Sequence, residues 1–262
     1  MPSRYRFIYL TILTALLCLT ASASEDAATT ISFASGKWNA SQWTPVRLPN
    51  QEKAVPLIQK PTSIGTTEAS FSETDYGKER DNALSLYDTG ILEGQVEVTL
   101  GLGKGFGNFS SPGVCISPTV KDGNFVSGIA VFVGTYAVAV WYEYAEGDVM
   151  KYKHLAQITR WSDPTKQHVL RCRFSKKKQC ISINIDNSDI LTFEFVGNLR
   201  LSNIPQEINS TIALWGCHGV SDFYTMTILD AYKMQGEEGL LPFFMRTDPK
   251  AGTSVQKKAP GN

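Results

Sequence analysis

The sequence lacks an excess of charge of either sign, since 25 basic residues stand against 25 acidic residues. Proteins that hold nucleic acid or an anionic membrane surface electrostatically carry a basic patch or stripe. The one strongly basic run, Lys176–Lys178, falls at the expected tip of a hairpin, where solvated charges are common. The composition therefore argues against nucleic acid as a partner.

Long hydrophobic runs are missing after the N-terminal segment. Phe7–Leu19 is apolar but shorter than the roughly 20 residues that a membrane-spanning helix needs. It follows Arg4 and Arg6 and precedes Ala21-Ser22-Ala23, which is the arrangement of a cleavable secretory signal. We therefore expect a signal peptide over residues 1–23, a secreted or periplasmic location and no membrane span. The alternative is an uncleaved N-terminal membrane anchor.

Cysteine and histidine are scarce. Beyond Cys18 in the expected signal, four cysteines allow two disulfides with three possible connectivities: Cys115, Cys172, Cys180 and Cys217. Aligning the apolar sides of their strands turns Cys172 and Cys180 to opposite faces, which argues against that pair unless a bulge changes the register. The three histidines are scattered, and no two Cys or His pairs have the spacing of metal ligands. We expect no transition-metal site.

Helical periodicity is absent, whereas strand signals run from about Thr30 to Asp230. These features predict one all-β domain over residues 24–232, an antiparallel sandwich, with a partly disordered tail over 233–262. Gly36–Thr67 is rich in proline and polar residues and predicts long loops. The expected strands are Ile31–Ala34, Glu68–Ser72, Ala83–Tyr87, Gln95–Leu100, Gly113–Ser117, Phe125–Val133, Tyr136–Tyr144, Lys151–Ile158, His168–Phe174, Cys180–Ile185, Ile190–Phe195, Thr211–Trp215 and Phe223–Leu229.

The clearest hairpin joins Phe125–Val133 to Tyr136–Tyr144 through Gly134-Thr135, which suits a two-residue type II′ turn. Alternation then predicts a bulky core face that includes Phe125 and Tyr136. The opposite face carries small residues around Trp141, which this register places across from Gly128. Room beside an aromatic ring suits a ligand or another part of the chain.

Several short segments, taken in order, resemble the concanavalin A-like lectin/glucanase superfamily. They are Leu92–Val98, Gly113–Ile116, Tyr136–Val140, the hairpin Val169–Asn187, and Ile212–Gly216 followed by Asp222–Leu229. The chain is most similar to the exported bacterial branch with laminin-G-like and 3-keto-disaccharide hydrolase-like domains. The resemblance implies a jelly-roll sandwich of two curved sheets whose concave face often binds carbohydrate.

Two catalytic strands of that superfamily are missing from the sequence. There is no Glu-x-Asp-x-(x)-Glu segment of the laminarinase type, which sets two carboxylates on one face for retaining hydrolysis. A Tyr-Phe-Lys-Ala-Gly-like strand of the alginate-lyase type is also missing. Relatives often bind calcium through loop carboxylates, so a structural calcium ion is one expectation. The loop aspartates are Asp122, Asp148, Asp163 and Asp222, and no other cofactor is expected.

Three sets of residues are candidates for chemistry. Glu97 and Glu143 could act together as acid and base on a glycosidic bond if they share the concave face. Trp141 could stack on a sugar ring. A polar hairpin face could bind hydroxyl or carboxylate groups of a glycan, and it carries Arg171, Arg173, Ser182 and Asn184. Each set also has an ordinary structural explanation, as solvated surface or as core.

These observations favour an exported carbohydrate-binding domain. A glycan hydrolase that uses concave-face carboxylates is the second hypothesis, and a non-catalytic structural or adhesion module is the third. The sequence does not identify the glycan or the oligomeric state.

Overall fold

The computed structural model describes residues 28–49, 51–67, 83–105, 110–175, 180–186, 189–194 and 209–230. The expected signal peptide, the expected tail and the predicted strand Glu68–Ser72 lie outside these residues. No helix in the described ranges is long and apolar enough to cross a membrane.

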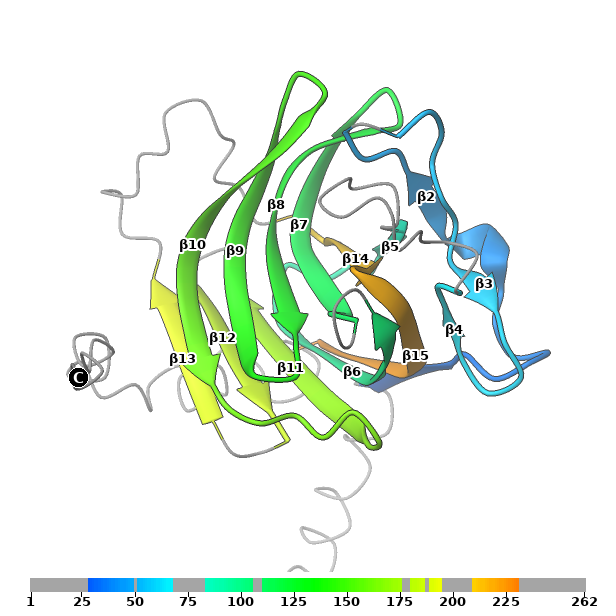
Figure 1. The fold of residues 1–262 in the computed structure, drawn as a ribbon, viewed down its shortest axis with the longest axis vertical. Helices are drawn as coiled ribbons and strands as arrows, with labels where there is room; N and C mark the ends of the chain where they lie inside the picture. Colours follow the sequence, from blue (N-terminus) through cyan, green and yellow to red (C-terminus); the bar gives the residue numbers. More distant parts are fainter. Residues whose placement is uncertain are drawn as a thin grey trace, which may run out of the picture.

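The described chain forms two antiparallel sheets that pack face to face, as the all-β sandwich prediction required (Figure 1). One is eight-stranded, in the order β13-β12-β11-β6-β15-β4-β3 with β1 also paired to β15. Its strands are β1 (Ala28–Ser32), β3 (Ile58–Gln59), β4 (Ile64–Gly65), β6 (Glu93–Gly105), β11 (Gln167–Ser175), β12 (Cys180–Ile185), β13 (Asp189–Glu194) and β15 (Gly219–Asp230).

The second sheet is seven-stranded, in the order β10-β9-β8-β7-β14-β5-β2, and lies toward the viewer in Figure 1. Its strands are β2 (Thr44–Val46), β5 (Ala83–Asp88), β7 (Gly113–Lys121), β8 (Asn124–Val133), β9 (Ala137–Glu146), β10 (Val149–Thr159) and β14 (Thr211–Gly216). The segment predicted as loops, Gly36–Thr67, also contains β2, β3, β4 and a 3-10 turn at Ala40–Gln42, so that prediction was too coarse.

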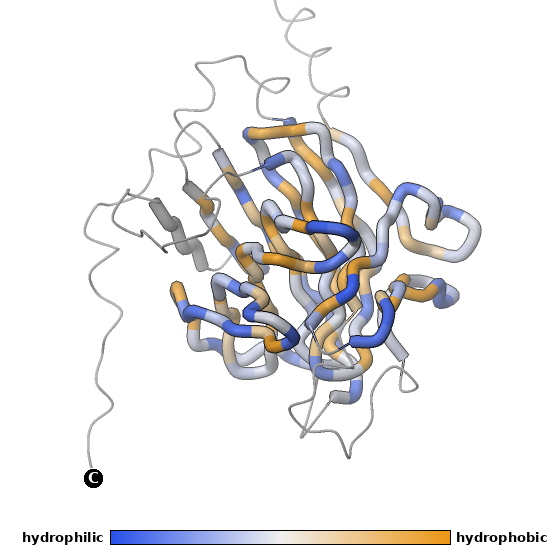
Figure 2. Tube along the Cα trace, turned by 90° about the horizontal axis from the view of Figure 1, so that it is seen from above, coloured by the Kyte–Doolittle hydropathy of each residue, from blue (hydrophilic) through white to orange (hydrophobic). Residues whose placement is uncertain are grey.

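The main core lies between the sheets and takes one residue in two from each long strand. Val96, Val98 and Leu100 of β6 are fully buried in it, and Val138 and Val140 of β9 approach from the other layer. This follows from the period of two in a strand, which sends alternate side chains to opposite faces. Figure 2 shows hydrophobic (orange) and hydrophilic (blue) residues following one another along the same stretches of chain.

The β8–β9 hairpin is longer in the turn than predicted. Val133 pairs with Val138, and the Gly134 N–H donates to the Ala137 carbonyl oxygen at 2.9 Å. Three residues, 134–136, therefore lie between the two strands in place of the predicted two. The register shifts by two residues. Each side chain therefore stays on its predicted face of the sheet, but the residue opposite it on the neighbouring strand is a different one. Trp141 lies opposite Ala130 and not opposite Gly128.

Two members of the predicted core face lie elsewhere. Tyr136 is 62% exposed, because it belongs to the longer turn and not to the strand. Phe125 is buried on the other face of the sheet, where it packs edge-on against Trp215. The β7–β8 pairing shifts register between Ile116 and Val120, and such irregularities re-aim nearby side chains.

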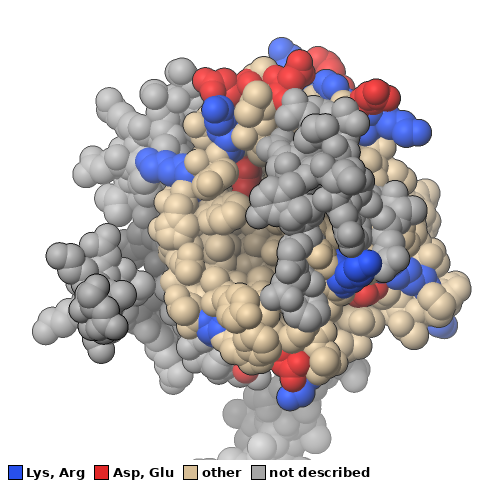
Figure 3. Space-filling model, viewed as in Figure 1, with Lys and Arg blue, Asp and Glu red and all other residues tan. Residues whose placement is uncertain are grey.

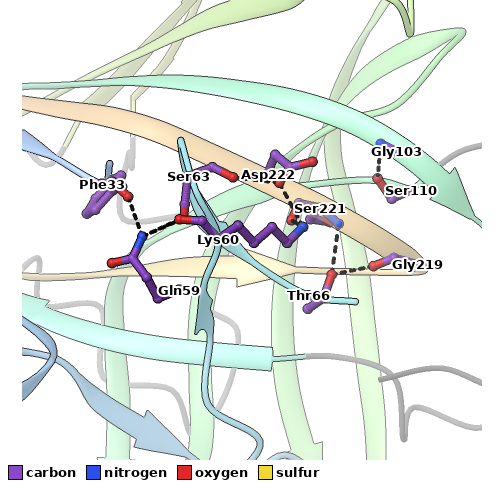
Figure 4. A network of polar contacts seen from close by, with 10 residues as sticks. All are labelled: Phe33, Gln59, Lys60, Ser63, Thr66, Gly103, Ser110, Gly219, Ser221 and Asp222. Carbon is purple, nitrogen blue, oxygen red and sulfur yellow. Dashed lines mark hydrogen bonds and ion pairs between the residues drawn. The ribbon is translucent and has the colours of Figure 1, made fainter. Parts of the chain in front are cut away.

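A polar network holds the β3–β4 hairpin against β15 (Figure 4). Lys60 Nζ lies 2.7 Å from an Asp222 carboxylate oxygen, which also accepts from the Ser63 hydroxyl at 2.8 Å. Just after β4, the Thr66 hydroxyl oxygen accepts a hydrogen bond from the Ser221 N–H at 2.8 Å. Asp222 therefore belongs to a strand and serves a structural ion pair, whereas the sequence suggested a loop.

The two disulfides that the cysteine count allowed cannot both form, because two of the four cysteines carry free thiols. Cys115 and Cys172 are buried free thiols in the described structure. Cys172 faces the main core and pairs across the hairpin with Ile183, while Cys180 pairs with Ser175. The expected separation of Cys172 from Cys180 is confirmed. Burial raises the pKa of the Cys172 thiol to about 12.

Candidate functional site

A second buried cluster covers the outer face of the seven-stranded sheet, on the side away from the main core. We call it the outer aromatic face. Residues adjacent in sequence divide between the two sides: Leu214 enters the main core, while Ala213 and Trp215 enter this cluster. Its buried members are Val46, Leu48, Leu84, Cys115, Phe125, Ala130, Phe132, Ala213, Trp215 and Cys217, with Leu86, Val120, Trp141 and Met150 partly buried against them. Figure 3 shows a hollow on this side, lined mostly by uncharged atoms, with charged groups at its rim.

A continuous row of aromatic rings crosses this face. Tyr152 and Trp141 are stacked, with ring centroids 4.8 Å apart and planes at 21°. Trp141 meets Phe132 edge-on at 5.7 Å, and Phe132 meets Trp215 at 5.2 Å. Offset stacks and edge-to-face contacts are the favourable geometries for such rings. The row therefore forms a preorganised aromatic surface.

Exposure changes along this row. Trp215 and Phe132 are 2% and 5% exposed, Trp141 is partly buried, and Tyr152 is 63% exposed. The inner end of the row is thus a core element. The outer end, over β9 and β10, presents aromatic surface to solvent. Trp141 was predicted from the sequence, whereas Tyr152 was missed because no register had been assigned to β10.

Two indole N–H groups in the row have no hydrogen-bond partner among the described residues. Trp141 Nε1 and Trp215 Nε1 are both buried and unpaired within the described part of the chain. An indole N–H can only donate, and buried donors are nearly always paired in folded proteins. The face therefore has donor capacity that the described residues do not satisfy.

Glu143 lies on the same face, two residues along β9 from Trp141. It is 4% exposed and sits between Gly128 on β8 and Tyr152 on β10. Burial, and then the Glu143 charge, raise the pKa of the Cys115 thiol well above its usual value. A Cβ at position 128 would collide with Cys115 Sγ, so glycine is required for this packing. Glu143 thus places a carboxylate beneath the exposed end of the row.

Glu97 does not join Glu143. It lies on β6 in the other sheet and points away from the core, since its neighbours Val96 and Val98 point inward. There it accepts from Arg171 Nε at 2.6 Å. The acid–base pair suggested from the sequence is therefore wrong in its geometry. Strand alternation separates two faces but does not say which sheet a strand joins.

Arg171, Arg173, Ser182 and Asn184 do share one face, as predicted, on the outside of the eight-stranded sheet. They are engaged with neighbouring strands: Arg171 Nη1 donates to Asn184 at 3.3 Å, and Arg173 Nε donates to Gln95 at 2.8 Å. Burial, and then the Arg171 charge, lower the pKa of Arg173. These contacts describe a self-contained polar ladder across three strands.

Two of the four loop aspartates considered for a calcium ion are engaged by neighbouring residues of the protein. Asp222 is committed to Lys60 and Ser63, and Asp163 accepts from the backbone and hydroxyl of Thr165. Within the described ranges, no group of three His, Cys, Asp or Glu side chains could hold a metal ion.

No protein-family model and no curated protein matches the sequence. Among solved structures, the chain is similar to a glycoside hydrolase family 16 endo-glucanase from Bacteroides ovatus, with TM-score 0.50, 12% identity, and coverage of 77% of this chain and 99% of the glucanase. It is also similar to the catalytic domain of an endo-1,3-β-glucanase from Thermotoga petrophila, with TM-score 0.50, 10% identity, and coverage of 77% and 96%. The fold is therefore concanavalin A-like, as the resemblance implied.

Proposed function

We propose that the outer aromatic face binds carbohydrate and that the protein is an exported carbohydrate-binding domain. The single observation that carries the proposal is the stacked Tyr152–Trp141 pair, whose outer ring is 63% exposed at the end of a rigid aromatic row. Flat aromatic faces suit the apolar face of a sugar ring, and preorganised rings lose little conformational entropy on binding. The solved structures of similar fold include enzymes that act on glucans, which supports the choice of ligand class.

Polar recognition has candidates beside the platform. The Trp141 indole N–H lacks a partner in the described structure, and the Glu143 carboxylate can accept hydrogen bonds from hydroxyl groups. A sugar presents both acceptors and donors around its ring. The arrangement of one apolar platform with a few convergent polar groups is typical of small-molecule sites.

Binding is favoured over hydrolysis by the distribution of carboxylates. Both stereochemical courses of glycoside hydrolysis use two carboxyl groups on either side of the scissile bond. In the described strands of the seven-stranded sheet, Glu143 is the one acidic residue away from a strand end, the others being Asp88 and Glu146. The described strands of this sheet therefore supply no pair of carboxyl groups for hydrolysis.

The test is retention on a panel of immobilised glycans that includes β-1,3-glucan, mixed-linkage glucan, mannan and chitin. Trp141→Ala should weaken retention at least tenfold. Trp141→Phe should weaken retention less, because an aromatic ring face remains at this position. Arg171→Ala, on the opposite outer face, is the matched control and should bind as the unmodified protein does.

Retention by Trp141→Ala and Tyr152→Ala equal to that of the unmodified protein would refute the proposal. That outcome would favour the structural or adhesion module. The proposed export is tested separately, by N-terminal sequencing of the protein purified from its host, which should begin near Ser24.

A further inference from the structure

A second pair of exposed aromatic rings lies at the end of the seven-stranded sheet. Of the described aromatic residues, three are largely exposed: Tyr136 at 62%, Tyr152 at 63% and Trp161 at 58%. Tyr152 belongs to the outer aromatic face. Tyr136 and Trp161 instead contact one another, with ring centroids 5.3 Å apart and planes at 57°. We call this pair the end platform.

The end platform joins two loops that are distant in sequence. Tyr136 lies in the turn between β8 and β9, and Trp161 follows β10 in the connection to β11. Both connections lie at the lower end of the sheet in Figure 1. The pair therefore lies at one end of the sheet that carries the outer aromatic face.

Backbone hydrogen bonds fix the two loops to each other. The Arg160 N–H donates to the Tyr136 carbonyl oxygen at 3.1 Å, and the Ser162 N–H donates to the Thr135 carbonyl oxygen at 2.8 Å. The residues on both sides of Trp161 are thus held by the neighbouring turn. Ser162 is also fully buried, so the loop packs down at this point while the indole projects outward.

Arg160 anchors the same loop to the eight-stranded sheet. Its guanidinium lies 3.0 Å from the Asp186 carboxylate, which also contacts His168 Nδ1 at 2.8 Å and accepts from the Val169 N–H at 2.8 Å. Burial acts to raise the pKa of Asp186, but the hydrogen bonds from Val169 and His168 and the nearby positive charges lower it overall. The carboxylate therefore stays ionised and clamps the loop.

The anchoring contacts come from backbone groups and from Arg160, and the exposed rings take no part in them. More than half of each ring surface remains in water, so the rings contribute little burial to stability. Scattered exposed hydrophobic residues are ordinary, but two large rings in contact on rigid loops form a preformed apolar surface. Such a surface is suited to an external ligand.

We propose that the end platform is a further sugar-stacking subsite that engages a second part of the same glycan. This inference rests on the proposed function of the outer aromatic face. Tyr136 immediately precedes Ala137, the first residue of β9, and Trp141 lies four residues further along this strand, so the Cα atoms of Ala137 and Trp141 are roughly 13 Å apart at about 3.3–3.4 Å per residue. One monosaccharide cannot span that separation. The ligand is therefore an oligosaccharide or polysaccharide chain.

The test compares ligand lengths from one glycan series retained in the panel, from disaccharide to long oligosaccharide. Tyr136→Ala combined with Trp161→Ala should leave affinity for the shortest bound ligand unchanged. It should weaken the affinity for the longest ligand about tenfold, because the stacking contacts of one part of that ligand are lost. Trp161→Phe should restore part of the loss, and an unchanged midpoint of urea unfolding shows that the double variant stays folded.

Equal affinity of the double variant and the unmodified protein for long ligands overturns the inference. A loss that is the same at every ligand length also overturns it, because it places the rings at the primary site. If Trp141→Ala binds normally while the double variant loses retention, the proposed function fails and the end platform stands alone as the glycan site.

Discussion

The two outer faces of the sandwich differ in how completely their side chains satisfy one another. On the eight-stranded sheet, Arg171 bonds Glu97 and Asn184, and Arg173 bonds Gln95 across the strands. On the seven-stranded sheet, aromatic rings are stacked with one end exposed, and two indole N–H groups lack partners in the described chain. Both faces come from strands of the same alternating pattern.

This difference distinguishes a face that stabilises the sheet from the face that we propose binds a ligand. A polar face whose charges meet matching partners in neighbouring strands has little left to offer a ligand. An aromatic face that is preordered and partly exposed offers a ligand a contact surface at little cost in conformational entropy. The polar hairpin residues, which the sequence made candidates for binding, are better explained as sheet-stabilising contacts.

The largest expected effect tests the buried end of the aromatic row. Trp215→Ala should lower the free energy of unfolding by about 3–5 kcal/mol, because it empties a fully enclosed site between Phe125 and Phe132. Trp161→Ala removes the same side chain from an exposed position and is the matched control. Urea denaturation measures both, and similar losses would break the distinction between the buried and exposed rings.

Removal of the Asp186 carboxylate should have the next largest effect on stability. Asp186→Asn should cost about 2 kcal/mol, since hydrogen bonds to a charged group are lost toward Val169, His168 and Arg160.

The sign of the pH dependence follows from the lowered pKa of Asp186. Its stabilisation is complete above the unfolded pKa, about 3.8, and is lost as the pH falls through the lower folded value. Denaturant titrations at descending pH should show that the free energy of unfolding falls more steeply below the unfolded pKa for the unmodified protein than for Asp186→Asn. Parallel curves would contradict the clamp.

A smaller effect on stability is expected from a change on the polar outer face of the eight-stranded sheet. Arg171→Ala should reduce stability by about 1 kcal/mol, since the ion pair with Glu97 is only partly buried. A double-mutant cycle with Glu97→Ala should give a favourable coupling energy, and glycan retention should not change. Loss of retention in Arg171→Ala would instead make this face a binding surface.

The smallest effect concerns the buried thiols. Burial raises the pKa of Cys172 to about 12, and that of Cys115 is also raised, so little thiolate forms at neutral pH. Peptide mapping after iodoacetamide treatment of the folded protein should find both cysteines unmodified. In denaturant both cysteines should be alkylated rapidly. Rapid labelling of folded Cys115 would show that the aromatic face opens.

The strand pattern of the sequence predicted much of the fold and part of the site. Hydrophobic alternation placed Cys172, Leu170 and Phe174 on the core side, and the structure agrees. It also put Trp141 on the face opposite the core. The partner predicted for Trp141 was wrong because the turn is longer than predicted and moves the register by two, and turn length depends on backbone geometry that composition indicates weakly.

The sequence by itself determined an all-β sandwich and the face of each long strand, because side chains alternate with a period of two. Only the tertiary structure decided which faces became neighbours. It separated Glu97 from Glu143 onto different sheets, stacked Tyr152 on Trp141, and joined Tyr136 to Trp161 across 25 positions of sequence. The reason is physical: strand order and register arise from packing and loop closure between distant segments, and local alternation carries no information about them.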